Sequence, residues 1–363
     1  MRPSTVADVQ RDPFCLDGLD LKTLEDRPRV IVSNEVFPPV VDGVSVRYIA
    51  PPPWAVLRRV CSRIPPANSL LGWMGALLVA GGLLLGMRRR DAVGLVSLGD
   101  RSGILFCLLN SFRWFRGGPV LAYRVLLPAN PGRLKTYLIG RILRNVTLTA
   151  VWSRAQIENY HRVFKCPRDK FVFLPYKANH SKSAAFPMPV GDYIFSGGNS
   201  ERDYKTLFEA VRGLSIPVIV SVTRPTVMGG LTVPKNVILV NAVEPAFERL
   251  MAGARMLALC LKEDILRGSG EATMLNAMWH GKPVVIADDV SAPDYINDGV
   301  DGFIVPAGSS EQMRCRILEL WKDPLFAARV GEAGRGKIVR LYTHQQYKTR
   351  MQALALLMFH RSK

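Results

Sequence analysis

The chain has 363 residues, of which 48% are hydrophobic, 9% aromatic and 21% charged, and its formal net charge is +18. This composition excludes an intrinsically disordered chain, a collagen-like repeat and a fibrous protein. The length is about twice that of a typical domain, so we expect two hydrophobic cores. The six cysteines are scattered without a Cys-x-x-Cys pair, which argues against a disulfide scaffold or a zinc ribbon and favours reduced thiols in the cytoplasm.

The first half of the chain alternates short apolar runs with helical patterns. Residues 1–20 contain no apolar run, so we expect no secretory signal and treat residues 1–24 as an N-terminal extension. Strands are predicted at 29–33, 92–97, 119–123, 147–152 and 171–174, and helices at 102–115, from Asn130-Pro131 onward, and at 153–163. Residues 25–178 are therefore predicted to form one Rossmann-like domain.

An uncharged segment, residues 70–87, interrupts this alternation and is followed by three arginines at 88–90. Its length lies at the lower limit for crossing a bilayer. Because a strand is predicted directly after it, the segment also fits a buried crossover helix of a parallel sheet. A third interpretation is a helix lying in the membrane interface, with the arginines at the level of the headgroups. The sequence leaves all three interpretations open.

The second half repeats the alternation after a break. Residues 179–190 contain prolines and serines without periodicity and are predicted to be a linker. Strands are expected at 193–196, 217–222, 236–240, 256–260 and 283–287, with helices at 203–211, 244–252, 271–280, 310–323, 325–342 and 344–359. Residues 191–342 are assigned to a second Rossmann-like domain, and residues 343–363 to a C-terminal helix that returns to the first. The predicted fold class is α/β, with two doubly wound parallel sheets and ligands in an interdomain cleft at the carboxyl ends of the strands.

The positive charge is concentrated in the first half. Residues 43–180 contain 21 basic and four acidic side chains. Such a field attracts phosphates, nucleic acid or an anionic bilayer, although a solvated basic surface would have the same composition. Aromatic side chains are not interleaved with the basic ones and no nucleic-acid-binding module is recognisable, so we expect no nucleic acid partner.

A glycine-rich turn in the second half is the clearest candidate for a ligand site. Gly268 and Gly270 stand immediately before a predicted helix that begins at Glu271. Glycines let the backbone approach a ligand closely, and the free N–H groups of a helix N-terminus suit a diphosphate. Glu271 has a simpler explanation as well, because an acid in the first turn of a helix is favourable without any ligand.

The run 269–285, together with 298–306, resembles the donor-site segment of the retaining glycosyltransferases of family 4. The positions that match are Ala277, Met278, Gly281, Pro283, Val284 and Val285. Segment 37–43 is similar to the family's N-terminal glycine loop, 172–176 to the strand before the linker, and 195–204 to the loop that opens the donor domain. The resemblance implies a two-domain GT-B fold and a nucleotide-diphosphate sugar as the donor substrate.

The resemblance also implies the positions of the donor site. The residues it assigns to the donor are Gly43, Gly198, Arg202, Gly268, Ser269, Gly270, Glu271, Thr273 and Asn276. Arg202 stands where the family has a phosphate-binding lysine, and it retains the charge. Asn276 stands where the family has a glutamate that binds the ribose, and an amide cannot accept two hydroxyl donors as a carboxylate does. Glu271 is the candidate to replace that glutamate, and a degraded site with Asn276 on the helix surface remains the alternative.

The family's first-domain histidine has no counterpart near Tyr123. Arg124 and Asp100 are the positional candidates to approach the sugar, and surface loop residues are an equally open interpretation. No paired carboxylates are evident for double displacement, so the resemblance favours a front-face mechanism with Arg202 and the 268–271 turn stabilising the leaving diphosphate. Because no Asp-x-Asp pattern occurs, we expect neither a metal nor another cofactor.

The basic first domain and its apolar segment indicate a glycan or lipid-linked acceptor at an anionic membrane surface. The expected location is cytoplasmic, with peripheral attachment to the membrane as an open alternative. The rival interpretation is a non-catalytic GT-B protein that binds a nucleotide or scaffolds a transferase complex, which the departures at Asn276 and Arg124 permit. A sugar epimerase of the same fold has no support from the charge distribution. The sequence does not predict the oligomeric state.

Overall fold

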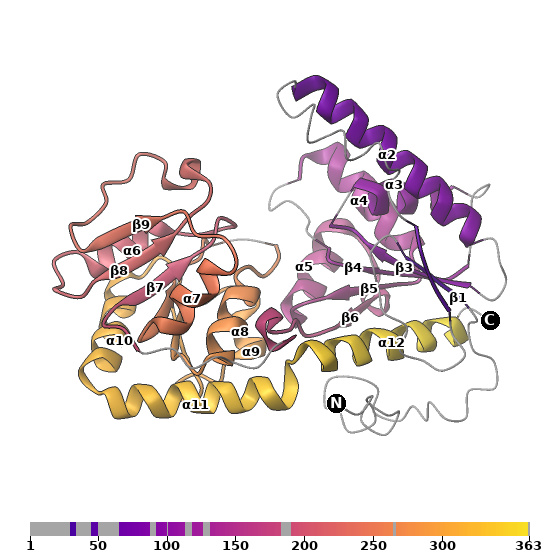
Figure 1. Ribbon diagram of the computed structural model, residues 1–363. Helices are drawn as coiled ribbons and strands as arrows, with labels where there is room; N and C mark the ends of the chain where they lie inside the picture. Colours follow the sequence, from indigo (N-terminus) through magenta and orange to yellow (C-terminus); the bar gives the residue numbers. More distant parts are fainter. Residues whose placement is uncertain are drawn as a thin grey trace. The chain divides into compact units, whose positions relative to one another are not determined.

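The computed structural model describes residues 30–33, 45–49, 65–87, 92–99, 101–112, 118–125, 131–182, 190–263 and 266–361 (Figure 1). The chain divides into two compact units. Unit 1 contains residues 1–152, 157–174 and 348–363, and unit 2 contains residues 153–156 and 175–347. The C-terminal helix α12 (His344–Arg361) therefore begins in unit 2 and contributes most of its length to unit 1.

Unit 1 is built on a sheet of six parallel strands. Their order is β2 (Ser45–Tyr48), β1 (Val30–Ser33), β3 (Ala92–Ser97), β4 (Val120–Tyr123), β5 (Leu148–Val151) and β6 (Phe171–Phe173). Every residue of β3, β4 and β5 is buried, as expected where helices cover both faces of a parallel sheet. Strand β2 was not predicted from the sequence.

The uncharged segment of unit 1 forms α2 (Pro65–Gly86), which packs along α3 (Arg101–Asn110) (Figure 1). One face of α2 is buried and includes Ala76, Val79, Ala80 and Leu83, whereas the other face exposes Trp73, Met74, Leu77, Leu78 and Leu85. The helix connects parallel strands of one sheet, as the crossover interpretation predicts, but only one of its faces is buried. Within the described residues, no helix combines the length and the hydropathy that a membrane span requires.

Unit 2 contains a second sheet of six parallel strands. Their order is β12 (Phe303–Val305), β11 (Val284–Ala287), β10 (Met256–Leu259), β7 (Ile194–Gly197), β8 (Val218–Ser221) and β9 (Val237–Val240). The strand order reverses between β7 and β10, so the chain leaves these neighbouring strands toward opposite sides. In open parallel sheets ligands bind outside the carboxyl ends of the strands at such a point. The predicted fold class, with two doubly wound parallel sheets, is confirmed; β12 was not predicted.

Three helices of unit 2, α6 (Tyr204–Val211), α10 (Ser310–Lys322) and α11 (Pro324–Leu341), begin at capping residues. This unit also contains α7 (Ala246–Gly253), α8 (Glu271–Trp279) and α9 (Ala292–Tyr295). The side chains of Asp203, Ser309 and Asp323 accept hydrogen bonds from the N–H groups of Thr206, Gln312 and Phe326. Such caps satisfy donors that the first helical turn leaves unpaired. Helix α8 differs, because its N-cap residue Gly270 has φ +87° and no side chain caps it.

One sequence segment that carries the family resemblance, residues 298–306, has a structural role in unit 2. Asp301, within the 298–306 run, is buried and forms an ion pair with Lys337 of α11 at 2.9 Å. The carboxylate also accepts a hydrogen bond from the N–H group of Asn297. This pair attaches the segment before β12 to α11.

The described part of the chain contains four cysteines. Cys107, Cys166 and Cys260 are buried, Cys315 is exposed, and all four are free thiols. The prediction of unpaired thiols is confirmed for these four residues.

Replacing Gly331 of α11 by alanine is expected to destabilise unit 2, although alanine normally favours a helix. A Cβ atom at this position would lie 2.1 Å from the carbonyl oxygen of Gly281, so α11 and α8 must separate. Overpacking of this kind costs about 1–3 kcal/mol. Urea denaturation measures the free energy of unfolding, and Gly336→Ala on the same helix, where a Cβ meets no atom within 4 Å, is the matched control. Equal stability of the two variants would contradict this packing.

Candidate functional site

Most predicted donor residues come together at the carboxyl ends of β7 and β10. Gly198 and Arg202 follow β7, and the turn 268–271 lies between β10 and α8. Of the remaining predicted residues, Thr273 and Asn276 lie on α8, and Arg124 follows β4 in unit 1. Gly43 and Asp100 lie outside the described residues.

Arg202 is buried and organises the two loops around it. Its Nε donates to the carbonyl oxygen of Gly197 at 2.9 Å, and Nη1 donates to that of Ser200 at 2.8 Å. On the side of α8, Nη1 and Nη2 lie 3.4 Å and 3.2 Å from the hydroxyls of Ser269 and Thr273. Burial lowers the pKa of the guanidinium, and the nearby Glu271 and Asp289 oppose that shift. The predicted phosphate-binding residue therefore joins the 197–200 loop to α8.

Gly198 has a conformation that this arrangement requires. Its φ is +112°, and a Cβ would lie 2.6 Å from Nη2 of Arg202. A side chain would both strain the backbone and displace the guanidinium. The next residue, Asn199, connects the loop to the end of β8, because its Oδ1 accepts from the N–H groups of Thr223 and Arg224.

Free N–H groups were predicted at the start of α8, but the N–H group of the donor-site residue Ser269 is engaged. Its N–H group donates to Oδ2 of Asp289 at 3.0 Å, and its hydroxyl donates to the carbonyl oxygen of Ser200 at 2.9 Å. Ser269 is also buried. The expectation that this amide is free is therefore wrong, because a carboxylate following β11 occupies the turn. Sequence reasoning missed Asp289; the signal was an acid directly after a buried strand, at the edge where ligands bind.

Glu271 is the buried acid of the site. Its Oε1 has no hydrogen-bond partner, and the side chain lies in the first turn of α8. Burial raises the pKa of Glu271 to about 7, and the negative charge of Asp289 adds to this effect, while Arg267 and Ser291 oppose it. Burial also raises the pKa of Asp289, although backbone N–H groups of Ser269 and Ala292 oppose the shift. Glu271 is therefore partly protonated near neutral pH.

Asn276 is buried and faces the segment that precedes β7 in the chain. Its Oδ1 accepts a hydrogen bond from the N–H group of His180 at 3.2 Å. His180 belongs to the short 3-10 helix η5 (Asn179–Lys182). The interpretation of Asn276 as a helix-surface residue is therefore wrong. Its Oδ1, which was expected to accept from a ribose hydroxyl, instead binds the backbone of η5 and holds this short helix against α8.

Arg267 is a second cation of the site that sequence reasoning did not select. Its Nη2 donates to the hydroxyl of Ser200 at 3.2 Å, and Nη1 donates to the carbonyl oxygen of Gly268 at 3.2 Å. Glu201 lies 3.8 Å away. The signal in the sequence was a basic residue directly before the Gly-Ser-Gly turn.

A pocket of about 260 Å³ opens beside these loops at the ends of β7, β8 and β9. Its lining consists of Gly198, Asn199, Ser221, Thr223, Ala242, Val243, Glu244 and Phe247. The ring of Phe247 packs edge-on against Phe195, with the ring centres 5.2 Å apart. Small-molecule sites usually measure about 300–1,000 Å³, so this pocket suits one part of a ligand, such as a nucleoside.

In unit 1, the predicted residue Arg124 follows β4 and has a positive φ of 51°. A Cβ on Gly99, which follows β3, would lie 3.3 Å from Nε of Arg124. The hydroxyl of Ser97 accepts from the N–H group of Gly99. Arg124 therefore lies beside the turn after β3, at the carboxyl ends of two neighbouring strands.

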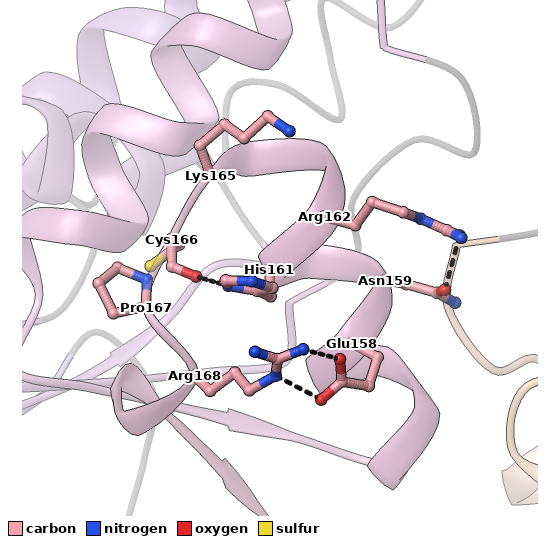
Figure 2. A pocket seen from close by; sticks show the side chains of 8 residues that line it. All are labelled: Glu158, Asn159, His161, Arg162, Lys165, Cys166, Pro167 and Arg168. Carbon is pink, nitrogen blue, oxygen red and sulfur yellow. Dashed lines mark hydrogen bonds and ion pairs between the residues drawn. The ribbon is translucent and has the colours of Figure 1, made fainter.

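Figure 2 shows a larger pocket of about 660 Å³ in unit 1, lined by residues from the end of α5 (Arg154–Phe164) and the segment after it. The guanidinium of Arg168 forms two hydrogen bonds, of 2.7 Å and 2.6 Å, with the carboxylate of Glu158 (Figure 2). Both side chains are more than half exposed, so the pair contributes little to stability. The C-terminus of α5 leads to the amino end of β6, which is opposite to the edge where parallel sheets bind ligands. This pocket contains none of the predicted site residues.

The comparisons with known proteins agree with this architecture. Residues 220–323 match the family model described as Glycosyl transferases group 1. No curated protein sequence matches the chain. Among solved structures, sucrose-phosphate synthase from Thermosynechococcus elongatus is similar at 14% identity and a TM-score of 0.65, with 92% of this chain and 90% of that chain covered.

Two further structures are similar at 14% identity. HepE of Anabaena, solved with UDP and glucose, has a TM-score of 0.61, with 86% of this chain and 85% of that chain covered. For TarM the TM-score is 0.59, and the match covers 78% of this chain but only 58% of TarM. The two parallel sheets and these neighbours establish a two-domain Rossmann-like GT-B fold, and residues 220–323 match a group 1 glycosyltransferase domain.

Proposed function

We propose that the chain transfers a sugar from a nucleotide-diphosphate donor to an acceptor with retention of the anomeric configuration. The observation that carries the proposal is the pocket at the ends of β7, β8 and β9. Six of its eight lining residues belong to the segment that matches the group 1 glycosyltransferase model, and the pocket lies beside two buried or half-buried arginines. UDP is the first nucleotide to test, because HepE was solved with UDP-glucose and a TarM structure contains UDP.

In this proposal the nucleoside occupies the pocket and the diphosphate extends toward the 197–202 loop and the start of α8. Helix α8 has no side-chain cap, so its first N–H groups and its dipole favour a negative charge. Arg202 and Arg267 supply positive charge on either side of Ser200. The protonated form of Glu271 tolerates an anion nearby, whereas its ionised form repels one.

The proposed chemistry is electrostatic. As the bond between the sugar and the diphosphate breaks, negative charge grows on the leaving oxygen, and fixed cations and amide dipoles stabilise that charge. The leaving diphosphate then takes the proton of the attacking acceptor hydroxyl on the same face of the sugar. This step requires no protein nucleophile and no metal at the diphosphate, as the resemblance to family 4 implies.

The acceptor is proposed to be a glycan or lipid-linked molecule at an anionic membrane surface on the cytoplasmic side. The support comes from α2, whose exposed face carries Trp73, Met74, Leu77, Leu78 and Leu85. The guanidinium of Arg101 lies 4.9 Å from the ring centre of Trp73, so a basic group accompanies the apolar face. An apolar helix face within a basic domain suits the interface of an anionic bilayer.

The donor proposal predicts that UDP stabilises the protein against heat. A hundredfold excess over the dissociation constant is expected to add about 2.7 kcal/mol to the free energy of unfolding. Thermal shifts with UDP, GDP and ADP measure this effect, and NMR of the product made from the preferred nucleotide sugar reports the anomeric configuration. Ala242→Phe fills the pocket and is expected to abolish the shift, whereas Val339→Phe on the exposed face of α11 keeps it. No shift with any nucleotide, or an inverted product, would contradict the proposal.

A second candidate function, nucleotide binding without transfer, is favoured by the engaged amide of Ser269 and the engaged amide oxygen of Asn276. A thermal shift without transfer to any glycan or lipid-linked acceptor would support it. The variant Asn276→Glu introduces the glutamate that family 4 has at this position. A gain in sugar transfer would indicate that the donor site is degraded, and a loss would indicate that asparagine is required.

The membrane proposal predicts that the protein floats with anionic vesicles at low salt and much less with zwitterionic vesicles. The triple change Leu77→Gln, Leu78→Gln and Leu85→Gln is expected to reduce flotation at least about tenfold, since each leucine contributes roughly 1.5–3 kcal/mol when buried. The control is Leu325→Gln, an exposed leucine of unit 2. Equal flotation of the triple variant and the control would show that the exposed face of α2 does not bind the membrane.

A further inference from the structure

Two histidines and a glutamate from distant parts of unit 2 converge beside the candidate donor pocket. His180 lies on η5, Glu248 on α7, and His280 directly after α8. Their side chains are 8%, 16% and 2% exposed. His180 and His280 are 100 residues apart in the chain, which is why the sequence did not predict a metal site here.

The three ligand atoms form a nearly equilateral triangle. Nδ1 of His180 is 3.3 Å from Nε2 of His280, Nε2 of His280 is 3.2 Å from Oε1 of Glu248, and that oxygen is 3.4 Å from Nδ1 of His180. In a tetrahedral zinc site with bonds of about 2.0–2.1 Å, neighbouring ligand atoms are about 3.3–3.4 Å apart. The triangle thus has the dimensions of one face of a zinc coordination tetrahedron.

The second ring nitrogen of His180, Nε2, has the kind of partner that metal-binding histidines have. This nitrogen lies 3.2 Å from Oε1 of Glu244, and a carboxylate in this position accepts the Nε2–H proton. The lone pair of His180 then resides on Nδ1, which faces the triangle. Histidines that bind metals commonly donate their second N–H group to a carboxylate in this way.

The proton count of the triangle also favours a cation. Without a cation, Nδ1 of His180 and Oε1 of Glu248 would both act as hydrogen-bond acceptors. A single proton on Nε2 of His280 would then have to be shared between them, over distances of 3.3 Å and 3.2 Å.

We propose that His180, Glu248 and His280 bind a divalent cation, with zinc favoured by two imidazoles and one carboxylate. The ion connects η5 to α7 and to the end of α8, and Glu244 links it to the wall of the donor pocket. Its role is structural, and it is distinct from any cation at the diphosphate. The three side chains leave a fourth coordination position for a further ligand.

The test uses the full-length, tag-free protein after treatment with EDTA, titrated with ZnCl₂ in a calorimeter. We expect one equivalent of zinc to bind and the melting temperature to rise. The variants His180→Ala and Glu248→Gln are expected to lower the zinc affinity by at least about 100-fold, and Glu244→Gln by about 10-fold. His161→Ala, a histidine of unit 1 that contacts the carbonyl oxygen of Cys166, is the matched control and keeps the wild-type affinity.

Failure of the wild-type protein to bind zinc stoichiometrically would overturn the proposal, as would unchanged affinity in Glu248→Gln. Circular dichroism checks that each variant is folded. Should both ligand variants unfold, titration of the wild-type protein with Co²⁺ decides the matter. Intense visible absorption bands indicate tetrahedral coordination and support the site, and weak octahedral bands or none exclude it.

Discussion

Replacing Arg202 by methionine is expected to lower the free energy of unfolding by about 4 kcal/mol and to abolish donor binding. The change removes four hydrogen bonds of a charged donor. The short bonds to Gly197 and Ser200 contribute on the order of 1.5 kcal/mol each, and the longer ones to Ser269 and Thr273 contribute less. It also removes a positive charge that interacts with the buried carboxyls of Glu271 and Asp289. Urea denaturation and nucleotide thermal shifts measure the two effects.

The variant Arg202→Lys separates the effect of the hydrogen-bond geometry from that of the charge, and Arg340→Met is its control. Arg202→Lys retains the charge but cannot reach both loops with a single amine, so we expect it to recover part of the nucleotide affinity and little of the stability. Arg340→Met, on an exposed part of α11, controls for the loss of a surface arginine. A stable Arg202→Met protein would show that the 197–200 loop does not depend on this guanidinium.

The free energy of unfolding is expected to fall by about 3 kcal/mol between pH 4.5 and pH 7 because of Glu271. Burial raises the pKa of this acid from 4.5 in the unfolded chain to about 7 in the folded protein, and Asp289 adds to the shift. Within this window the folded protein binds a proton that the unfolded chain has released, so stability decreases as the pH rises. Above pH 7 Glu271 is ionised in the folded protein, so the free energy of unfolding is lowered by the full penalty for a buried charge. Below pH 4.5 the acid is protonated in both states and this penalty is absent.

The variant Glu271→Gln isolates this contribution. A neutral glutamine cannot ionise, so the variant is expected to be more stable than the wild-type protein at pH 8 and to lose the corresponding part of the pH dependence. Urea denaturation at several pH values gives the free energies, and Glu209→Gln, an exposed position on α6, is the matched control. Parallel pH profiles for the wild-type protein and Glu271→Gln would contradict a raised pKa for this acid.

The same variant tests the site. If the protonated carboxyl admits a diphosphate beside α8, the wild-type affinity for UDP decreases as the pH rises through 7, whereas that of Glu271→Gln does not. Isothermal titration at pH 6 and pH 8 compares the two proteins. A wild-type affinity that is the same at both values would place the diphosphate away from Glu271.

Much of the fold followed from the sequence alone, since buried parallel strands are recognisable as short apolar runs separated by helical patterns. Strands β3, β4, β7, β8 and β10 were all predicted within a few residues of their observed bounds. Strands β2 and β12 were missed. The three residues of β12 follow Gly302 and carry too little pattern to separate a strand from a turn.

The candidate site was predicted less completely. The 268–271 turn was located by a local signal, two glycines directly before a predicted helix, whereas Arg202 was located by the resemblance to family 4. The tertiary structure decided what these groups contact: Asp289 reaches the amide of Ser269, and η5 covers Asn276. It alone brought His180 to within 3.3 Å of His280. Local sequence specifies which atoms are available, whereas hydrogen-bond partners separated by tens of residues are set by how the sheet and helices pack.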